Sequence, residues 1–303
     1  MKTKKIKNSS IKSKREKASI KIQEVYDFLC QFAPPQLAES WDNIGLQVGN
    51  LDDEVNTILV SLDVTEEVLW EAVDHEAQVI ITHHPLFFKP IQCLDDSQVS
   101  TRLARLASNM DITILSFHTN LDATQNGLND LLAEQLKLKN CTPLLASQNS
   151  QKSKTGLGRV GQLSKKVTLQ NLLENISSQL KIKNIRFAGS LFHEVKKVAV
   201  MTGSGAGFFN EALTAGADVL VTGDLKYHQA LDAISQSISI IDIGHFAGEI
   251  GMVSLVTEKL KAWAKKQNHA LQIFGTQVQS DPIQYWNSQA SLPENFLEKF
   301  KVA

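Results

Sequence analysis

The 303-residue sequence has little of what marks secreted or membrane proteins. Its three cysteines, Cys30, Cys93 and Cys141, are odd in number and show no C-x-x-C spacing. They do not form a disulfide framework, and we interpret them as free thiols of a reducing cytoplasm. No segment reaches the roughly 18 uninterrupted apolar residues of a membrane span, and residues 20–32 are amphipathic and not a secretory signal. We therefore predict a cytoplasmic protein without a membrane segment.

The sequence also lacks the two best-known glycine motifs for nucleotides. The segment Gly203-Ser-Gly205-Ala-Gly207 has neither the G-x-G-x-x-G spacing nor the Gly-Lys-Ser/Thr ending of a P-loop. Backbone donors in such a turn can contact a phosphate, but a tight strand-to-helix turn is the favoured interpretation. Dinucleotide binding and P-loop ATP chemistry are therefore not supported.

The overall charge of −1 hides an uneven distribution, because residues 1–17 contain eight Lys or Arg and one Glu. This composition predicts a disordered basic tail over residues 1–19. Such an arm can bind nucleic acid or act as a targeting signal, but a solvated tail is favoured, and nucleic acid is not an expected partner. The length suits two domains, or one large one, with ample core.

Two adjacent histidines, His83 and His84, end the apolar run Val79–Thr82 and are followed by Pro85. Successive residues on a strand point to opposite faces, so both rings can converge only where the strand ends and the backbone turns. Pro85 biases His84 away from helix. Neutral imidazole is a good ligand for Zn, Fe, Ni and Cu. The pair alone is weak support for a metal site, because solvated or structural histidines are common.

An internal repeat strengthens the metal interpretation. Ala77–Thr82 and Ala217–Thr222 share an Ala-polar start, three apolar residues and a Thr, and each follows an apparent strand and helix. Each precedes an apolar run that ends in a histidine with an acid four residues on: His118 with Asp122, and His245 with Glu249. Two related halves facing each other would bring four strand ends into one cleft.

The alternation of strands and helices predicts an α/β fold with two related halves, each with a largely parallel sheet. Ligands of such sheets gather beyond the carboxyl ends of the strands, so we expect a metal site in the cleft between the halves. The expected organisation is a basic tail over 1–19, a first half over 20–143, a linker over 144–158, a second half over 159–281 and a peripheral tail over 282–303.

Five ordered motifs between Ile20 and Asp281 resemble the family of GTP cyclohydrolase I type 2 homologues, also called YbgI-like or NIF-three-like proteins, which carry a dinuclear metal centre. The motifs are Trp41-Asp-Asn-Ile-Gly-Leu-Gln-Val-Gly49, Ile81-Thr-His-His-Pro-Leu-Phe-Phe88, His118-Thr-Asn-Leu-Asp122, Gly223-Asp-Leu-Lys-Tyr-His228 and Gly244-His-Phe-Ala-Gly-Glu249. Residues 136–195 are too few for the domain that some relatives insert there, so the chain resembles the compact form.

The resemblance implies that two divalent cations are held by the residues that match the family's ligands: His83, His84, Asp122, His245 and Glu249. It further implies that the carboxylates bridge the cations, that the 41–43 segment lies near the cleft and that the protein is a homohexamer. Imidazole with carboxylate suits Zn, Fe, Mn and Ni alike, so the metal is not determined.

Two further histidines are candidates for proton transfer. Internal symmetry pairs His118 with His245, and we expect His118 to support the site through a hydrogen bond to a ligating carboxylate. His228 follows the second repeat and is a candidate general acid or base; a histidine on a helix surface is the equal alternative.

Paired cations can activate water and clamp an oxygen-rich substrate. The leading hypothesis is therefore a metal-dependent hydrolase acting on a nucleotide-like or phosphorylated small molecule. The name of the resembling family implies opening of the guanine ring of GTP, although no sequence feature identifies a guanine pocket. The alternative is a non-catalytic protein that stores metal or acts as an oligomeric scaffold.

Overall fold

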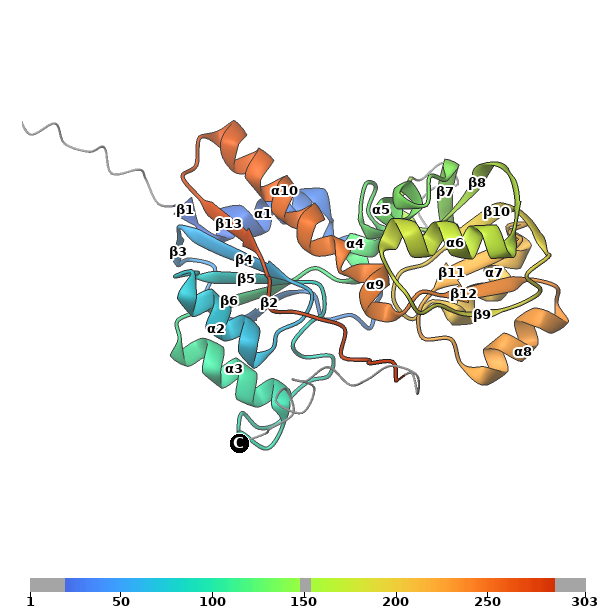
Figure 1. Ribbon diagram of the computed structural model, residues 1–303. Helices are drawn as coiled ribbons and strands as arrows, with labels where there is room; N and C mark the ends of the chain where they lie inside the picture. The colour runs from blue at the N-terminus through green and yellow to red at the C-terminus, as the bar shows by residue number, and fades with distance from the viewer. Residues whose placement is uncertain (1–19, 148–153, 287–303) are drawn as a thin grey trace, which may run out of the picture.

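The computed structural model describes residues 20–147 and 154–286, which form two α/β lobes (Figure 1). The predicted α/β class is confirmed, since each lobe is built on one sheet that contains parallel strands. The predicted basic tail and residues 287–303 lie outside the described residues. In the parts that are described, no helix combines the length and apolar character needed to cross a bilayer.

The first lobe contains a five-stranded sheet in which all strands but the last are parallel. In order across the sheet these strands are β13 (Gln272–Gly275), β4 (Thr57–Ser61), β5 (Val79–Thr82), β6 (Thr113–Ser116) and β2 (Gly45–Val48). A small antiparallel pair, β1 (Ile20–Lys21) with β3 (Glu54–Val55), lies beside it, and α1 (Ile22–Phe32) follows β1.

The second lobe contains a six-stranded sheet with a parallel centre and antiparallel strands on both sides, so it is mixed where a largely parallel sheet was expected. In order across the sheet its strands are β7 (Lys139–Ala146), β8 (Gly156–Thr168), β10 (Glu194–Val200), β11 (Val219–Thr222), β12 (Ser239–Asp242) and β9 (Arg186–Ala188). The helix α6 (Leu169–Leu180) packs against β8 and β10.

The internal repeat seen in the sequence is present in the fold. Strands β4, β5 and β6 are parallel neighbours, as are β10, β11 and β12. The connecting helices correspond in order, and the first set is α2 (Glu66–Asp74), α3 (Val99–Asn109) and α4 (Thr119–Ala123). The second set is α7 (Phe209–Thr214), preceded by the short 3-10 turn η2 (Ala206–Phe208), then α8 (Tyr227–Ser235) and α9 (His245–Glu249).

Local sequence explains why these elements begin where they do. The strands β5 and β11 are apolar throughout except for a final Thr, and every residue in them is buried. Thr65 caps α2, because its hydroxyl accepts the backbone N–H of Val68 at 3.3 Å, and Thr168 caps α6 in the same way.

The predicted boundaries divided the chain into two consecutive halves, but the first lobe contains segments from both ends of the described chain. Strand β7 begins at Lys139 and belongs to the second sheet, whereas the C-terminal helix α10 (Gly251–Gln267) and β13 return to the first lobe. Figure 1 shows both in orange and red among the blue elements. Helix α10 does so because Met252, Val256 and Leu260 complete the core that packs around β4.

One buried arginine connects the lobes. Arg159 in β8 is 1% exposed, and its guanidinium forms a two-point ion pair with Asp130 of α5 (Leu128–Gln135) at 2.5 and 2.9 Å. It also donates to the carbonyl oxygen of Thr124, directly after α4. A buried charge with so many partners fixes α4 and α5 against the second sheet.

Candidate metal centre

The five side chains predicted as metal ligands converge where the two lobes meet. His83 and His84 follow β5, Asp122 is in the last turn of α4, and His245 and Glu249 are the first and last residues of α9. The Nε2 atom of His83 is 3.8 Å from Asp122 Oδ2 and 3.7 Å from Glu249 Oε1. His118 and Asp122 are four residues apart, as are His245 and Glu249; His118 directly precedes α4, whereas α9 contains both of its residues. Residues at this spacing lie on the same side of a helix.

Three ligand atoms form a tight triangle. The Nε2 atoms of His84 and His245 each lie 3.0 Å from Oε2 of Glu249, and 3.2 Å from one another. At these distances Oε2 still accepts no hydrogen bond of acceptable angle from the described residues. Ligands held about 2.0–2.1 Å from one cation stand about 3.0–3.4 Å apart. These distances suit a hydrogen bond as well as a shared cation, and the unsatisfied Oε2 of Glu249 is what favours the cation.

The opposite side of each ligand ring is held by an oxygen. His84 Nδ1 lies 2.8 Å from Asp63 Oδ1, His245 Nδ1 lies 2.8 Å from Asp224 Oδ2, and His83 Nδ1 contacts the carbonyl oxygen of Phe117 at 3.0 Å. A donated Nδ1–H leaves Nε2 as a lone-pair donor directed into the site. Asp63 and Asp224 were not identified from the sequence, although each is an acid just after a buried strand.

His118 lies at the same centre. A ligand atom of His118 is within 4.8 Å of those of His83 and His84. Its Nδ1 is 2.9 Å from Oδ1 of the buried Asp42, whose other oxygen accepts the backbone N–H of Thr119. The expected partner of His118 was a ligating carboxylate; the structure supplies Asp42 instead, from the motif that was expected to lie near the cleft.

Burial and charge shift the protonation of the carboxylates in opposite directions. Burial raises the pKa of Asp122, whose Oδ1 accepts a hydrogen bond from Thr202 Oγ1 at 3.1 Å. Burial acts on Glu249 in the same direction, but the surrounding imidazoles outweigh it and hold its pKa well below the usual range. Glu249 is therefore a carboxylate in the folded protein.

The imidazoles respond to the same charge. Burial disfavours protonation of His84, but its contacts with Asp63 and Glu249 dominate and raise its pKa to about 10. The contact with Glu249 raises the pKa of His245 to about 9. In the absence of a cation, protons therefore compensate the carboxylates at neutral pH. Two protonated rings 3.2 Å apart repel each other, so a divalent cation is a better counter-charge.

Backbone geometry explains one glycine of the Gly203–Gly207 segment. Gly203 has φ +64°, and a Cβ atom placed on it would stand 2.3 Å from Glu249 Oε1. Only glycine lets the chain pass this close to the carboxylate. The segment is a tight turn against the cluster, which agrees with the favoured interpretation.

A cavity of about 380 Å³ opens onto the cluster, and residues of both lobes line it, including His84, His118, Asp122, His245 and Glu249. His228 is exposed on α8 and does not line this cavity. The structure thus brings together every predicted site residue except His228.

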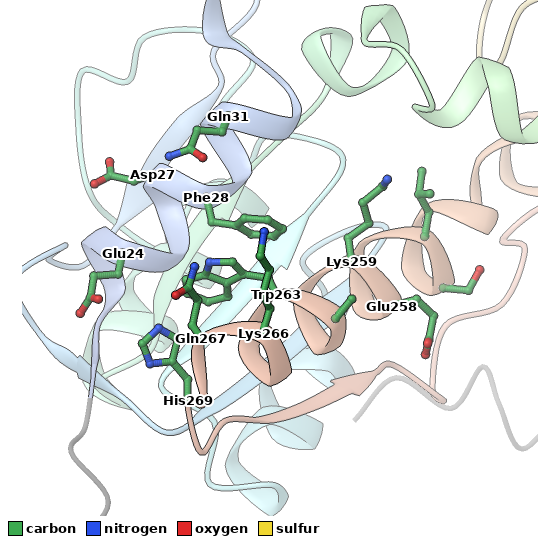
Figure 2. Close-up of a pocket in the computed structure, with 13 residues that line it drawn as sticks. Glu24, Asp27, Phe28, Gln31, Glu258, Lys259, Trp263, Lys266, Gln267 and His269 are labelled. Atoms are coloured by element: carbon green, nitrogen blue, oxygen red, sulfur yellow. The ribbon is translucent and has the colours of Figure 1, made fainter.

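A larger hollow of about 1090 Å³ lies elsewhere, between α1 and α10 (Figure 2). Phe28 and Trp263 stack in it with ring centroids 4.8 Å apart. None of the clustered histidines or carboxylates lines it. This hollow is larger than the cavity at the cluster, but no cluster of metal-ligand atoms among the described residues lines it, so we do not treat it as the functional site.

The donor set at the cluster fits divalent cations. It offers imidazole nitrogens and carboxylate oxygens, the ligands that Zn, Fe, Mn and Ni accept. The Nε2 atom of His83 is fully buried and has no hydrogen-bond partner among the described residues. A buried polar atom of this kind requires a partner, and a cation would satisfy it.

Fold and site together define a class: two-lobed α/β proteins with a histidine–carboxylate cluster between duplicated sheets. The sequence profile described as Duf34/NIF3 (NGG1p interacting factor 3) matches residues 20–282. The chain belongs to this family.

Relatives and solved structures agree. A GTP cyclohydrolase 1 type 2 homolog of Clostridium perfringens is 39% identical over 80% of this chain and 92% of its own length. A homolog of the same name from Clostridium acetobutylicum is 34% identical over 88% of this chain and 99% of its own length. The crystal structure of a Bacillus cereus protein related to NIF3 covers 89% of this chain and 100% of its own, at 27% identity and a TM-score of 0.84.

The compact form is also supported. The alignment with a GTP cyclohydrolase 1 type 2 homolog of Staphylococcus epidermidis runs over 367 positions, more than the 303 residues of this chain. That relative therefore contains residues that have no counterpart in this chain.

We predict that cation affinity rises with pH between about pH 6 and pH 8. The pKa values of His84 and His245 are raised, to about 10 and about 9, so both rings carry protons in this range and binding must release them. Each released proton changes the apparent Kd about tenfold per pH unit. Calorimetric titration with Mn²⁺ in buffers of different ionisation enthalpy measures the release. An affinity independent of pH would contradict the assignment.

We predict that Gly203→Ala weakens cation binding by about tenfold or more, as expected when a group that orients a ligand is disturbed. The new Cβ displaces the Glu249 carboxylate. The matched control is Gly207→Ala in the same segment, where a Cβ meets only Gln229 Nε2, at 3.7 Å. Calorimetry and elemental analysis of both variants, with circular dichroism to verify folding, provide the comparison; equal affinities would refute the role of Gly203.

Proposed function

We propose that the cluster binds two divalent cations per chain. His84, His245 and Glu249 would hold one of them, and His83, Asp122 and Glu249 would hold the other. The observation that carries the proposal is the convergence of these atoms while His83 Nε2 has no protein partner among the described residues. Zn, Fe, Mn and Ni all suit this ligand set.

We propose further that the protein is a metal-dependent hydrolase acting on a nucleotide-like or phosphorylated small molecule. When bound, paired divalent cations polarise a carbonyl or phosphoryl oxygen and lower the pKa of water. The relatives carry the name GTP cyclohydrolase 1 type 2 homolog, and opening of a guanine ring is one such hydrolysis.

The side chains have separate tasks in this proposal. Asp122, Glu249 and the three ligand histidines would hold the cations, while Asp63 and Asp224 orient two of the rings. His118 lines the cavity, and its Nδ1 is occupied by Asp42. Its other nitrogen is therefore free to accept or return a proton at the substrate. His228 is assigned no step, because it is exposed outside the cavity.

The alternative is a non-catalytic protein that stores metal or serves as a scaffold. The depth of the site favours it: the side chains of His83 and Glu249 are 0% and 3% exposed. Such burial retains a cation but restricts the approach of a bulky substrate. Turnover distinguishes the two functions.

We expect Asp122→Asn and Glu249→Gln each to lower turnover by about a hundredfold or more, since losing a ligand costs at least as much as losing its supporting partner. Purified protein loaded with Mn²⁺, Zn²⁺ or Fe²⁺ is tested on a panel of nucleotides, nucleosides and phosphoesters, and its metal content is measured by elemental analysis. The matched control is Glu258→Gln, an exposed carboxylate on α10 with one surface ion pair, to Lys261.

Each outcome has a distinct meaning. Turnover that both variants lose and the control retains supports the hydrolase. Two bound cations without turnover on any substrate of the panel support storage or scaffolding. A chain that binds no divalent cation contradicts both functions.

Self-association, expected as a hexamer, and a cytoplasmic location also belong to the proposal. Helix α8 exposes Tyr227, Leu231 and Ile234 on one face, and Phe192, also in the second lobe, is 84% exposed. Apolar patches of this kind often form interfaces. The three cysteines are free, as expected in a reducing compartment. Sedimentation velocity should show an assembly larger than 33.5 kDa; a monomer at all concentrations would contradict it.

A further inference from the structure

Two exposed aromatic rings border the cavity above the cluster. Trp41 is 61% exposed and Phe88 is 54% exposed, and both line the cavity. Each meets His118 edge to face, with centroids 6.0 and 5.8 Å apart and ring planes at 73° and 86°. Large aromatic side chains are usually well covered in a folded protein. Two of them open to solvent beside a ligand cluster therefore require an explanation.

The backbone that carries these rings is held by polar contacts. Asp42, next in the chain to the tryptophan, has a buried side chain. Its Oδ2 accepts hydrogen bonds from the backbone N–H of Thr119 at 3.0 Å and from the Thr119 hydroxyl at 2.5 Å. Asn43 donates from Nδ2 to the carbonyl oxygen of Phe87, next to the phenylalanine, at 2.7 Å. A pre-organised apolar surface binds a rigid partner with little loss of entropy.

Apart from the cluster histidines, the rest of the wall is uncharged or acidic. Leu145, Leu157, Met201 and Phe208 line it on the side of the second lobe. Among the residues of the described chain that line this cavity there is no lysine or arginine, the side chains that usually bind phosphate groups. One lysine, Lys89, lies in an adjoining hollow of about 420 Å³ that shares Trp41 and Phe88. Beyond the cluster itself, the described wall therefore offers one cationic side chain, Lys89, to a row of three phosphates.

We propose that the cavity binds a flat aromatic heterocycle of nucleoside size, with its ring against Trp41 and Phe88 and an oxygen-bearing edge toward the cluster, and that it gives no preference to a triphosphate. This rests on the proposed function, because the ring would be the substrate of the same site. A volume of about 380 Å³ accommodates such a molecule. Base–aromatic stacking tolerates different bases, so the class of ring is assigned and not its identity.

Binding of a defined panel tests the proposal. Protein with saturating Mn²⁺ is titrated calorimetrically with adenosine, guanosine, cytidine and uridine, with their triphosphates, and with ribose 5-phosphate, which has no aromatic ring. We expect at least one nucleoside to bind, and its triphosphate to bind within about tenfold of it. Trp41→Ala should weaken nucleoside binding by about tenfold or more, as loss of one stacking partner does, whereas Trp41→Phe should retain most of it.

The matched control is Trp70→Ala, which removes a tryptophan of similar exposure, 52%, from α2, outside the cavity lining; it should leave affinity unchanged. Repeating the titrations on metal-free protein separates this proposal from the proposed function, because the aromatic contribution does not depend on cations or turnover. The proposal is overturned if no nucleoside binds in a Trp41-dependent way at millimolar concentration. Triphosphates that bind about a hundredfold tighter than nucleosides, with no effect of Trp41→Ala, also overturn it.

Discussion

The buried carboxylate of Glu249 is the constraint on which the site depends. It is 2% exposed and surrounded by the rings of His83, His84 and His245. A charge in a low-dielectric interior must be compensated nearby, and here the compensation comes from groups that also bind divalent cations. The positive φ of Gly203 and the one-turn helix α9 both serve to place this carboxylate. The groups that compensate the buried charge of Glu249 in the fold are therefore the same groups that would bind metal.

The duplicated fold supplies these groups from equivalent positions in the two lobes. In each lobe the third strand of a parallel set leads into a one-turn helix. His118 directly precedes α4 and His245 is the first residue of α9, so the two helices present matching histidine–acid pairs. Parallel strands end at the same edge of a sheet, which collects polar side chains there. Helix α10 and β13 then return to the first lobe, and Arg159 ties α4 to the second sheet. These connections between the lobes keep the two sheet edges facing each other.

Much of this was predictable from local pattern. The apolar runs and the repeat of strand, helix and strand are local features, and the two matched runs form β5 and β11 as expected. The lobe boundaries were not predictable, because nothing local says that β13 pairs with β4, more than 200 residues earlier. His228 was placed by analogy with the first repeat, but α8 directs it to solvent.

The sequence by itself determined the chemistry available: imidazoles and acids at strand ends, repeated twice, within an α/β chain. Residue type and short-range spacing are sufficient for that, because both are written in consecutive residues. Only the tertiary structure decided which groups face each other. The Asp63 and Asp224 partners, the pairing of His118 with Asp42 and the aromatic border of the cavity all depend on distant segments meeting. Such contacts arise from packing of the two lobes, which no local pattern encodes.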